Sequence, residues 1–244
     1  MTAHRTIPAL RLLKLAPFLR PLVQAFYKRT SPVLKTELMG LSFTSPIGVA
    51  AGVDKRGEFT DVIACYSPSF IEVGPLREVM STIKHLQNRS EDIRILGNLS
   101  NTKNIVRSFS LIYDFVDAIV LNVSLNTTVS QVIEHLLELR RYNDTYKPII
   151  FKLNPDLTSE VLDELADYML SSGIDAVMVD AASVPNIREK THGLMPVIAH
   201  AVISSPERAA QLLDTGADLI AVSNSPFHYG PALIKRINKY LEKR

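Results

Sequence analysis

Short apolar runs rich in valine and isoleucine recur from residue 45 onward, and most are followed by a polar segment and then by apolar residues at helical spacing. This alternation is typical of βαβ units, in which helices join parallel strands. The predicted strands are residues 47–51, 70–73, 95–99, 118–123, 149–153, 176–180, 197–202 and 219–222. Eight such strands close most readily into a (β/α)8 TIM barrel, whereas an open doubly wound sheet, the alternative, seldom has eight evenly spaced units.

Helical spacing of apolar residues marks the connections between these strands. One helix is expected to begin at Pro206, because Ser205 is a candidate cap and proline is favoured at the first helical position. The stretch 182–195 has room only for a short helix over residues 186–190, which predicts a shortened crossover. The full helices are predicted over residues 105–115, 129–142, 158–170, 206–213 and 231–241.

A different pattern precedes the barrel. Residues 1–40 contain seven Lys and Arg residues against the single acid Glu37, and prolines at 8, 17 and 21 predict two short helices within residues 7–27. We therefore divide the chain into a basic helical extension, residues 1–40, and a barrel, residues 41–244. The extension has no apolar run of the roughly 18 to 20 residues that a spanning helix needs. It suits either the interface of an anionic membrane or packing against the barrel.

Composition narrows the classes of protein. A chain of 244 residues with 46% hydrophobic and 21% charged residues fits one globular barrel. The net charge of +2 argues against nucleic acid as a partner. The single cysteine, Cys65, excludes an intramolecular disulfide and a thiolate metal cluster, and no secretory signal is recognised, which indicates the cytoplasm. We expect no metal site.

Polar residues gather at the C-terminal ends of the predicted strands, where barrel enzymes build their sites. Lys152 stands inside an apolar strand, which is costly unless its ammonium meets an anionic or polar group. It either contacts a ligand or pairs with Asp180 on the neighbouring strand. Asn122 and Asn126 flank Ser124, a combination suited to a planar polar ligand with the serine available for proton transfer. The set is Gly52, Asp54, Lys55, Asn98, Ser100, Asn122, Ser124, Asn126, Lys152, Asn154, Asp180, His200, Ser223, Asn224 and Ser225.

Several motifs, in order along the chain, resemble the class 2 (quinone-linked) dihydroorotate dehydrogenases. The opening segment, residues 40–58, reads Gly-Leu-Ser-Phe-Thr-Ser-Pro-Ile-Gly-Val-Ala-Ala-Gly-Val-Asp-Lys-Arg-Gly-Glu. Further matches are Phe-Ile-Glu-Val-Gly at 70–74, Asn-Val-Ser at 122–124 with Asn-Thr at 126–127, Phe-Lys-Leu-Asn-Pro-Asp-Leu at 151–157, and Gly-Pro-Ala-Leu-Ile-Lys-Arg-Ile-Asn-Lys at 230–239. The resemblance covers nearly the whole chain, including the basic extension.

The resemblance implies a barrel that oxidises dihydroorotate to orotate, with hydride transfer to FMN, electron transfer to a quinone and a serine as base. Ser124 would then be the catalytic base. Substrate would contact Lys55, Asn122 and Asn126, and FMN would contact Ala51, Gly52, Asn98 and Lys152. In that family the N-terminal helices form the membrane-facing entrance for the quinone.

This sequence also departs from the family pattern. The loop after Asn122 is one residue shorter, so either Ser124 or Leu125 takes the position of the base. A long loop is missing after residues 74–76, and Ala181 replaces an asparagine that grips the substrate. The phosphate of FMN needs bare backbone at glycine turns, but Gly-Val-Gly-Gly of the family reads Ala-His-Ala-Val at 199–202 and another glycine is Ser225. We also expect Asp180 to neutralise Lys152.

These departures predict a divergent dihydroorotate dehydrogenase-like barrel with weakened or lost FMN binding and oxidoreductase activity, a pseudoenzyme that acts as a scaffold or as the partner of an active relative. One alternative is an active FMN-dependent enzyme of pyrimidine biosynthesis. Another is a non-catalytic barrel that binds a small metabolite. The expected location is the cytoplasm, with peripheral contact to the surface of the inner membrane and its quinone. The expected partners are a small-molecule ligand and either a second copy of the chain or an active relative.

Overall fold

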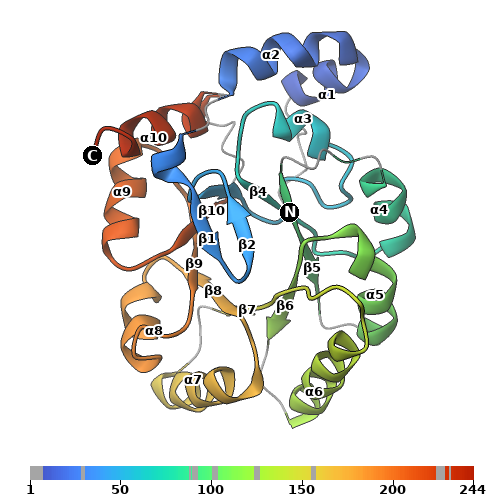
Figure 1. Ribbon diagram of the computed structural model, residues 1–244, viewed down its shortest axis with the longest axis vertical. Coiled ribbons are helices and arrows are strands. Elements are labelled where there is room, and N and C mark those ends of the chain that lie inside the picture. The colour runs from blue at the N-terminus through green and yellow to red at the C-terminus, as the bar shows by residue number, and fades with distance from the viewer. Residues whose placement is uncertain are drawn as a thin grey trace.

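The computed structural model describes residues 8–28, 31–87, 89, 93–100, 104–123, 127–154, 158–223, 229–230 and 232–244. Eight strands form a closed barrel in the order β10-β3-β4-β5-β6-β7-β8-β9, and every neighbouring pair is parallel (Figure 1). The strands are β3 (Ile47–Val49), β4 (Phe70–Val73), β5 (Arg94–Leu99), β6 (Ala118–Val123), β7 (Ile149–Leu153), β8 (Ala176–Asp180), β9 (Val197–Ala201) and β10 (Leu219–Val222). The predicted (β/α)8 barrel is confirmed, and each predicted strand is present with ends shifted by at most two residues.

Helices on the outside of the barrel connect the strands. Two of them were not predicted, α3 (Thr60–Ala64) and α4 (Val79–Leu86), and the predicted short helix in the sixth crossover is α8 (Val184–Lys190). The predicted cap is also confirmed, because the Ser205 hydroxyl accepts a hydrogen bond from the Arg208 backbone N–H. The others are α5 (Ile105–Ile112) with the 3₁₀ turn η3 (Tyr113–Phe115), α6 (Thr127–Arg141), α7 (Ser159–Ser172), α9 (Pro206–Asp214) and α10 (Leu233–Leu241).

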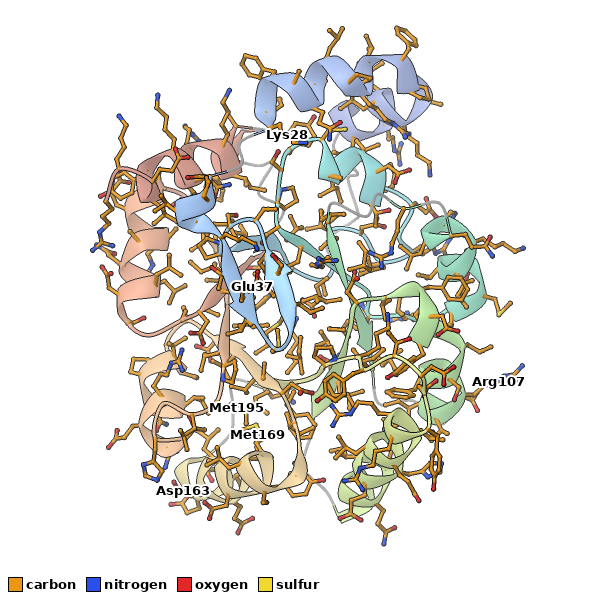
Figure 2. All side chains as sticks on the ribbon, viewed as in Figure 1. Lys28, Glu37, Arg107, Asp163, Met169 and Met195 are labelled. Carbon is orange, nitrogen blue, oxygen red and sulfur yellow. The ribbon has the colours of Figure 1, made fainter. Side chains whose placement is uncertain are left out.

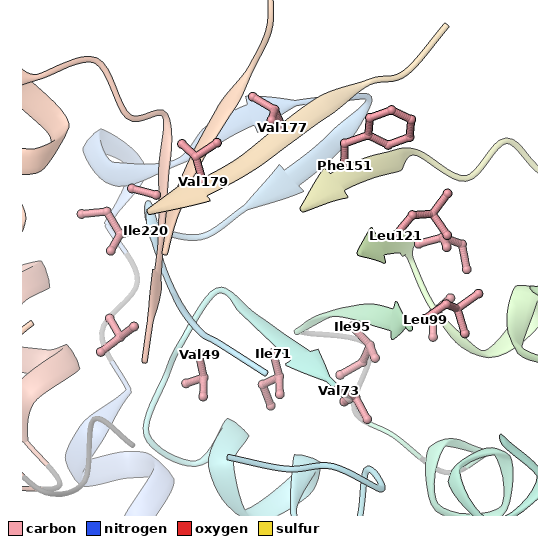
Figure 3. Packing of buried hydrophobic residues seen from close by; sticks show 14 of the residues in the cluster. Val49, Ile71, Val73, Ile95, Leu99, Leu121, Phe151, Val177, Val179 and Ile220 are labelled. Atoms are coloured by element: carbon pink, nitrogen blue, oxygen red, sulfur yellow. The ribbon is translucent and has the colours of Figure 1, made fainter. Parts of the chain in front are cut away.

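Alternating side chains divide the strands into two apolar layers. Residues such as Ile71, Val73 and Phe151 lie in the cluster between the strands and the surrounding helices (Figure 3). Residues such as Phe70 and Ile150 point the other way and belong to a separate cluster inside the barrel. The inner cluster contains Phe43, Ala50, Phe70, Leu96, Ala118, Val120, Ile150, Ala176, Met178, Ile198, Leu219 and Ala221.

A hairpin closes the N-terminal end of the barrel. It consists of β1 (Thr36–Leu38) and β2 (Leu41–Phe43), and Figure 1 shows it lying across the strands. Its tight turn places Met39 and Gly40 at φ 55° and 74°, a conformation that glycine adopts without strain. Phe43 packs edge-on against Phe70 at 5.9 Å between ring centroids. The opposite end, where the strands finish, is therefore the end that carries the candidate site.

An aspartate ahead of β6, β8 and β10 ties each of these strands to the strand before it. The carboxylate accepts a hydrogen bond from a backbone N–H of the preceding strand and a second from an arginine, so register is fixed at the N-terminal end of the barrel. The pairs are Asp117 with Ile95 N (2.7 Å) and Arg89, Asp175 with Ile149 N (2.8 Å) and Arg140, and Asp218 with Val197 N (2.7 Å) and Arg188.

The N-terminal residues form the two predicted short helices, α1 (Pro8–Leu15) and α2 (Arg20–Tyr27), joined by η1 (Pro17–Leu19), with η2 (Pro32–Leu34) following. The pair lies beside α3 and α10 at the outer edge of the barrel (Figure 1). Two ion pairs of 3.6 Å, Lys14 with Glu58 and Arg20 with Asp61, attach it there. Within the described ranges, no helix has the length and apolar character to cross a membrane.

Candidate functional site at the C-terminal end of the barrel

A polar layer lies directly above the apolar layer inside the barrel. Each of its residues lies two positions after a member of the inner cluster, on the same strand or, for Ser223, just beyond the end of β10, so it faces the interior as well. These residues are Glu72, Asn98, Asn122, Lys152, Asp180, His200 and Ser223. The candidate site therefore consists of seven polar side chains, one from the end of each of seven strands, which lie in two successive layers along the barrel axis.

Glu72 is the centre of this layer. Its side chain is 0% exposed, and the Lys152 ammonium lies 2.8 Å from Oε1 and 2.9 Å from Oε2. The Ala51 backbone N–H donates to Oε2 at 2.8 Å, and the Asn98 amide donates to Oε1. A buried carboxylate is costly unless it is paired and hydrogen-bonded, and here one cation and two neutral donors offset that cost.

Two asparagines extend the network toward β6. The Asn122 amide Nδ2 donates to Asn98 Oδ1 at 2.8 Å, and Asn98 is only 1% exposed. Asn98 thus uses both ends of its amide within the protein. Of the predicted site residues, the structure brings Ala51, Asn98, Asn122 and Lys152 together in one hydrogen-bonded network. Their roles as contacts to substrate or cofactor stay predictions.

The other predicted site residues lie apart from this network or outside the described residues. Gly52 adopts φ +95° and its N–H donates to the Gly74 carbonyl at 2.9 Å. Lys55 is exposed in the loop that follows. The predicted base Ser124, its alternative Leu125, and Asn126 lie outside the described residues, as do Asn224 and Ser225.

The loop that carries Lys55 is organised by Asp54. The Asp54 carboxylate accepts hydrogen bonds from the backbone N–H groups of Phe59 at 2.8 Å, Glu58 at 3.0 Å and Arg56 at 3.4 Å. Burial raises the pKa of Asp54, and these hydrogen bonds oppose the shift. Asp54 is therefore a structural residue that shapes the first loop at this end of the barrel.

The expected pairing of Lys152 with Asp180 is wrong. Lys152 pairs with Glu72, which stands three strands away in the barrel, and the Asp180 carboxylate accepts hydrogen bonds from Ala182 N at 2.8 Å and Ser183 Oγ at 2.6 Å. The register explains the difference, because the partner of Lys152 on β8 is Met178. Asp180 lies two residues further toward the end of β8, in the next interior layer. An acid within the apolar run 70–73 was the signal for Glu72 that sequence reasoning passed over.

His200 is the residue of the 199–202 segment that enters the interior. Its Cα partner on β8 is Asp180, so the two side chains are neighbours. Burial lowers the pKa of His200, the Lys152 charge lowers it further, and Glu72 and Asp180 oppose the shift, so the imidazole is neutral at pH 7. The side chains of Ala199 and Ala201 lie in the outer apolar cluster. Their Cβ atoms therefore do not enter the interior, and the effect of the missing glycines on a phosphate stays a prediction.

The chain is similar to known proteins over nearly its whole length. No family model matches it. It is 26% identical to a quinone-type dihydroorotate dehydrogenase of Proteus mirabilis, over 97% of this chain and 94% of that protein, and 24% identical to one of Roseiflexus sp., over 98% and 88%. A solved structure of DHODH from Eimeria tenella in complex with ferulenol has the same fold, with a TM-score of 0.75 at 19% identity over 96% of this chain and 94% of that chain. The chain is a distant homologue of the quinone-type dihydroorotate dehydrogenases.

This homologue of the dihydroorotate dehydrogenases is shortened internally. Its alignment with the Proteus mirabilis protein runs over 320 positions, more than the 244 residues of the chain, although both sequences are covered almost completely. Gaps inside the alignment account for the difference. The structure has one short connection where the sequence predicts a missing loop, because α4 begins at Val79, soon after β4 ends at Val73.

Dihydroorotate dehydrogenases use FMN, which has an uncharged ring system and an anionic phosphate. The phosphate needs close approach to bare backbone or a favourable charge. The resemblance places the phosphate beside residues 199–202, at the end of β9, and beside Ser225, which lies outside the described residues. At the end of β9 the described residues present the His200 imidazole with the Asp180 carboxylate of β8 next to it, and Val202 is 45% exposed. These residues do not fit an anionic group. The Glu72–Lys152 network offers hydrogen bonds to a planar ring, so the described residues do not fit the whole of FMN.

Proposed function

We propose that this chain is a divergent dihydroorotate dehydrogenase-like barrel in which FMN binding and dihydroorotate oxidation are weakened or lost. The observation that carries the proposal is the neighbouring pair of Asp180 and His200 inside the barrel on the β8–β9 side. A carboxylate there repels an anion, and a neutral imidazole adds bulk without compensating the charge. A phosphate needs close contact with backbone N–H groups, which glycine permits and which the side chains of Asp180 and His200 obstruct.

Titration with FMN tests the proposal. Purified protein is expected to quench flavin fluorescence only weakly, with a Kd above roughly 0.1 mM, a binding free energy less favourable than about −5.5 kcal/mol. Dihydroorotate-dependent reduction of an acceptor dye, measured with saturating FMN, is expected to stay at the level of the protein-free reaction. Stoichiometric uptake of FMN at micromolar concentration, together with turnover of dihydroorotate, would establish an active enzyme instead.

We also propose that the α1–α2 helix pair contacts an anionic membrane surface. Five of its large apolar side chains are exposed to solvent: Leu12 60%, Leu15 83%, Phe18 78%, Leu22 70% and Phe26 64%. Figure 2 shows side chains of the pair projecting away from the barrel, with Lys28 at the end of α2. Apolar side chains beside basic residues are typical of helices that lie in a membrane interface. Contacts with a quinone and with a partner chain stay predictions.

Cosedimentation with vesicles of phosphatidylglycerol tests this contact. Wild-type protein should pellet with the vesicles, and the triple variant Leu15→Ser, Phe18→Ser, Leu22→Ser should bind more than tenfold more weakly, because each buried large apolar side chain contributes about 1.5 to 3 kcal/mol. The matched control is the pair Tyr142→Ser and Leu194→Ser, which removes exposed apolar residues of the barrel. Equal pelleting of the wild type and the triple variant would refute the contact.

A further inference from the structure

We propose that Asp180 is a specificity-determining residue that makes the C-terminal end of the barrel unfavourable for anionic ligands and selects planar, uncharged ones. The inference rests on the proposed loss of FMN binding and names its cause and the ligand class that remains. It requires that the Asp180 carboxylate face the interior, that its charge be uncompensated, and that the rest of the layer add no net positive charge.

The orientation of Asp180 follows from its strand. Ala176 and Met178, two and four residues earlier on β8, both belong to the cluster inside the barrel. Side chains alternate along a strand, so Asp180 faces the same interior. Its Cα partner is His200 of β9. The influence of the Asp180 charge on the pKa of His200 agrees with this proximity.

The Asp180 charge has only neutral partners. Its hydrogen-bond donors are the Ala182 backbone N–H and the Ser183 hydroxyl. In the part of the chain that the structure describes, no Lys, Arg or His nitrogen lies within 4.0 Å of it, whereas Glu72 in the layer below pairs with Lys152. Glu72 and Lys152 cancel, and His200 is neutral at pH 7. The seven residues of the polar layer therefore carry a net charge of about −1.

A ligand at this end of the barrel thus meets a hydrogen-bonding network without net charge and, closer to the mouth, the negative charge of Asp180. Lys152 and Asn122, the two members of the network that are only partly buried, can still hydrogen-bond a ligand, and the network as a whole has no net charge, which suits the edge of a planar heterocycle with carbonyl and N–H groups. Asp180 lies toward the mouth, where an anionic substituent on that ring would be repelled. An uncharged heterocycle avoids the repulsion, so the two surroundings together select for it.

The experiment compares FMN with riboflavin, which has the same ring system without the phosphate. In Asp180→Asn the amide oxygen can still accept from Ala182 N and the amide NH2 can donate to Ser183 Oγ, so the loop after β8 should stay folded. FMN should bind the variant about ten times more tightly than wild type, equivalent to about 1.4 kcal/mol, and riboflavin should change by less than twofold. Asp144→Asn, in the exposed loop that leads into β7 at the other end of the barrel, is the matched control and should change neither affinity.

A second readout does not depend on ligand binding. The pKa of His200, followed by NMR, should fall in Asp180→Asn, because the Asp180 charge raises it in the wild type. The inference is overturned by an unchanged ratio of FMN to riboflavin affinity, by the absence of measurable binding of either flavin to the variant, or by an unchanged His200 pKa. Tight FMN binding by the wild type would instead refute the proposed function, and the ratio in the variant would still report on Asp180.

Discussion

Replacing Glu72 by leucine should lower the free energy of unfolding by about 3 kcal/mol at pH 7. The substitution leaves the Lys152 ammonium, whose side chain is 18% exposed, without its anionic partner. Removing one member of a buried ion pair typically costs about 3–5 kcal/mol, and the lower value is expected because Lys152 retains some contact with water. Ala51 N and Asn98 also lose their acceptor. Urea denaturation with a common m-value gives the difference.

The double variant Glu72→Leu, Lys152→Met is the control for this experiment. Replacing both members of a buried pair by apolar side chains of similar volume is often neutral or stabilising, so most of the lost free energy of unfolding should return. The double-mutant cycle then isolates the interaction between the two side chains. If the double variant is destabilised by the sum of the two single variants, Glu72 and Lys152 are not coupled, and the hydrogen-bonded network around Glu72 is contradicted.

The second large effect is expected at Asp175, in the tie between β7 and β8. Asp175→Ala should cost about 3 kcal/mol, because it leaves the Ile149 N–H and the buried Arg140 guanidinium, only 8% exposed, without their acceptor. The surface pair Arg244–Asp214 provides the matched control, since both side chains are about half exposed and Asp214→Ala should cost less than roughly 1 kcal/mol. Equal losses in the two variants would contradict a register-fixing role for Asp175.

The titration of Tyr146, followed by tyrosinate absorbance, reports on its hydrogen bond to Asp175. Burial and the hydrogen bond to Asp175 raise the pKa of Tyr146 to about 12. A phenol whose pKa is higher in the folded state favours folding below its unfolded pKa of about 10, and this contribution disappears as pH rises from about 10 to 12. In Asp175→Ala the late tyrosinate absorbance should move to lower pH. A titration unchanged by the substitution would mean that Asp175 does not hold the phenol.

The barrel was predictable from the sequence because its strands form short apolar runs that are easy to recognise. Runs such as 149–153 and 176–180 are buried on both faces, which leaves a continuous apolar signal, and turns and helices separate them regularly. The helix α3 escaped prediction because it has only five residues, too few for a clear helical period. The helix α4 was also missed, although its eight residues equal the length of the predicted α5. Their positions follow from barrel closure, which requires a crossover after every strand.

The site was predictable in its residues but not in its pairing. Lys152 was identified because a lysine in an apolar strand is unusual, but Glu72 lies 80 residues earlier in the chain and meets it across the barrel interior. Reasoning from the neighbouring strand chose Asp180, which the register places one interior layer away. Such a pairing depends on how the closed sheet staggers its strands, and a single sequence does not contain that information.

The most direct test of the account is the absorbance spectrum of the full-length protein as purified, recorded without added flavin and checked after denaturation for released cofactor. We expect a colourless protein with far less than one flavin per chain, because the described residues at the ends of β8 and β9 do not fit an anionic phosphate. A yellow protein that releases one FMN per chain on denaturation would contradict it.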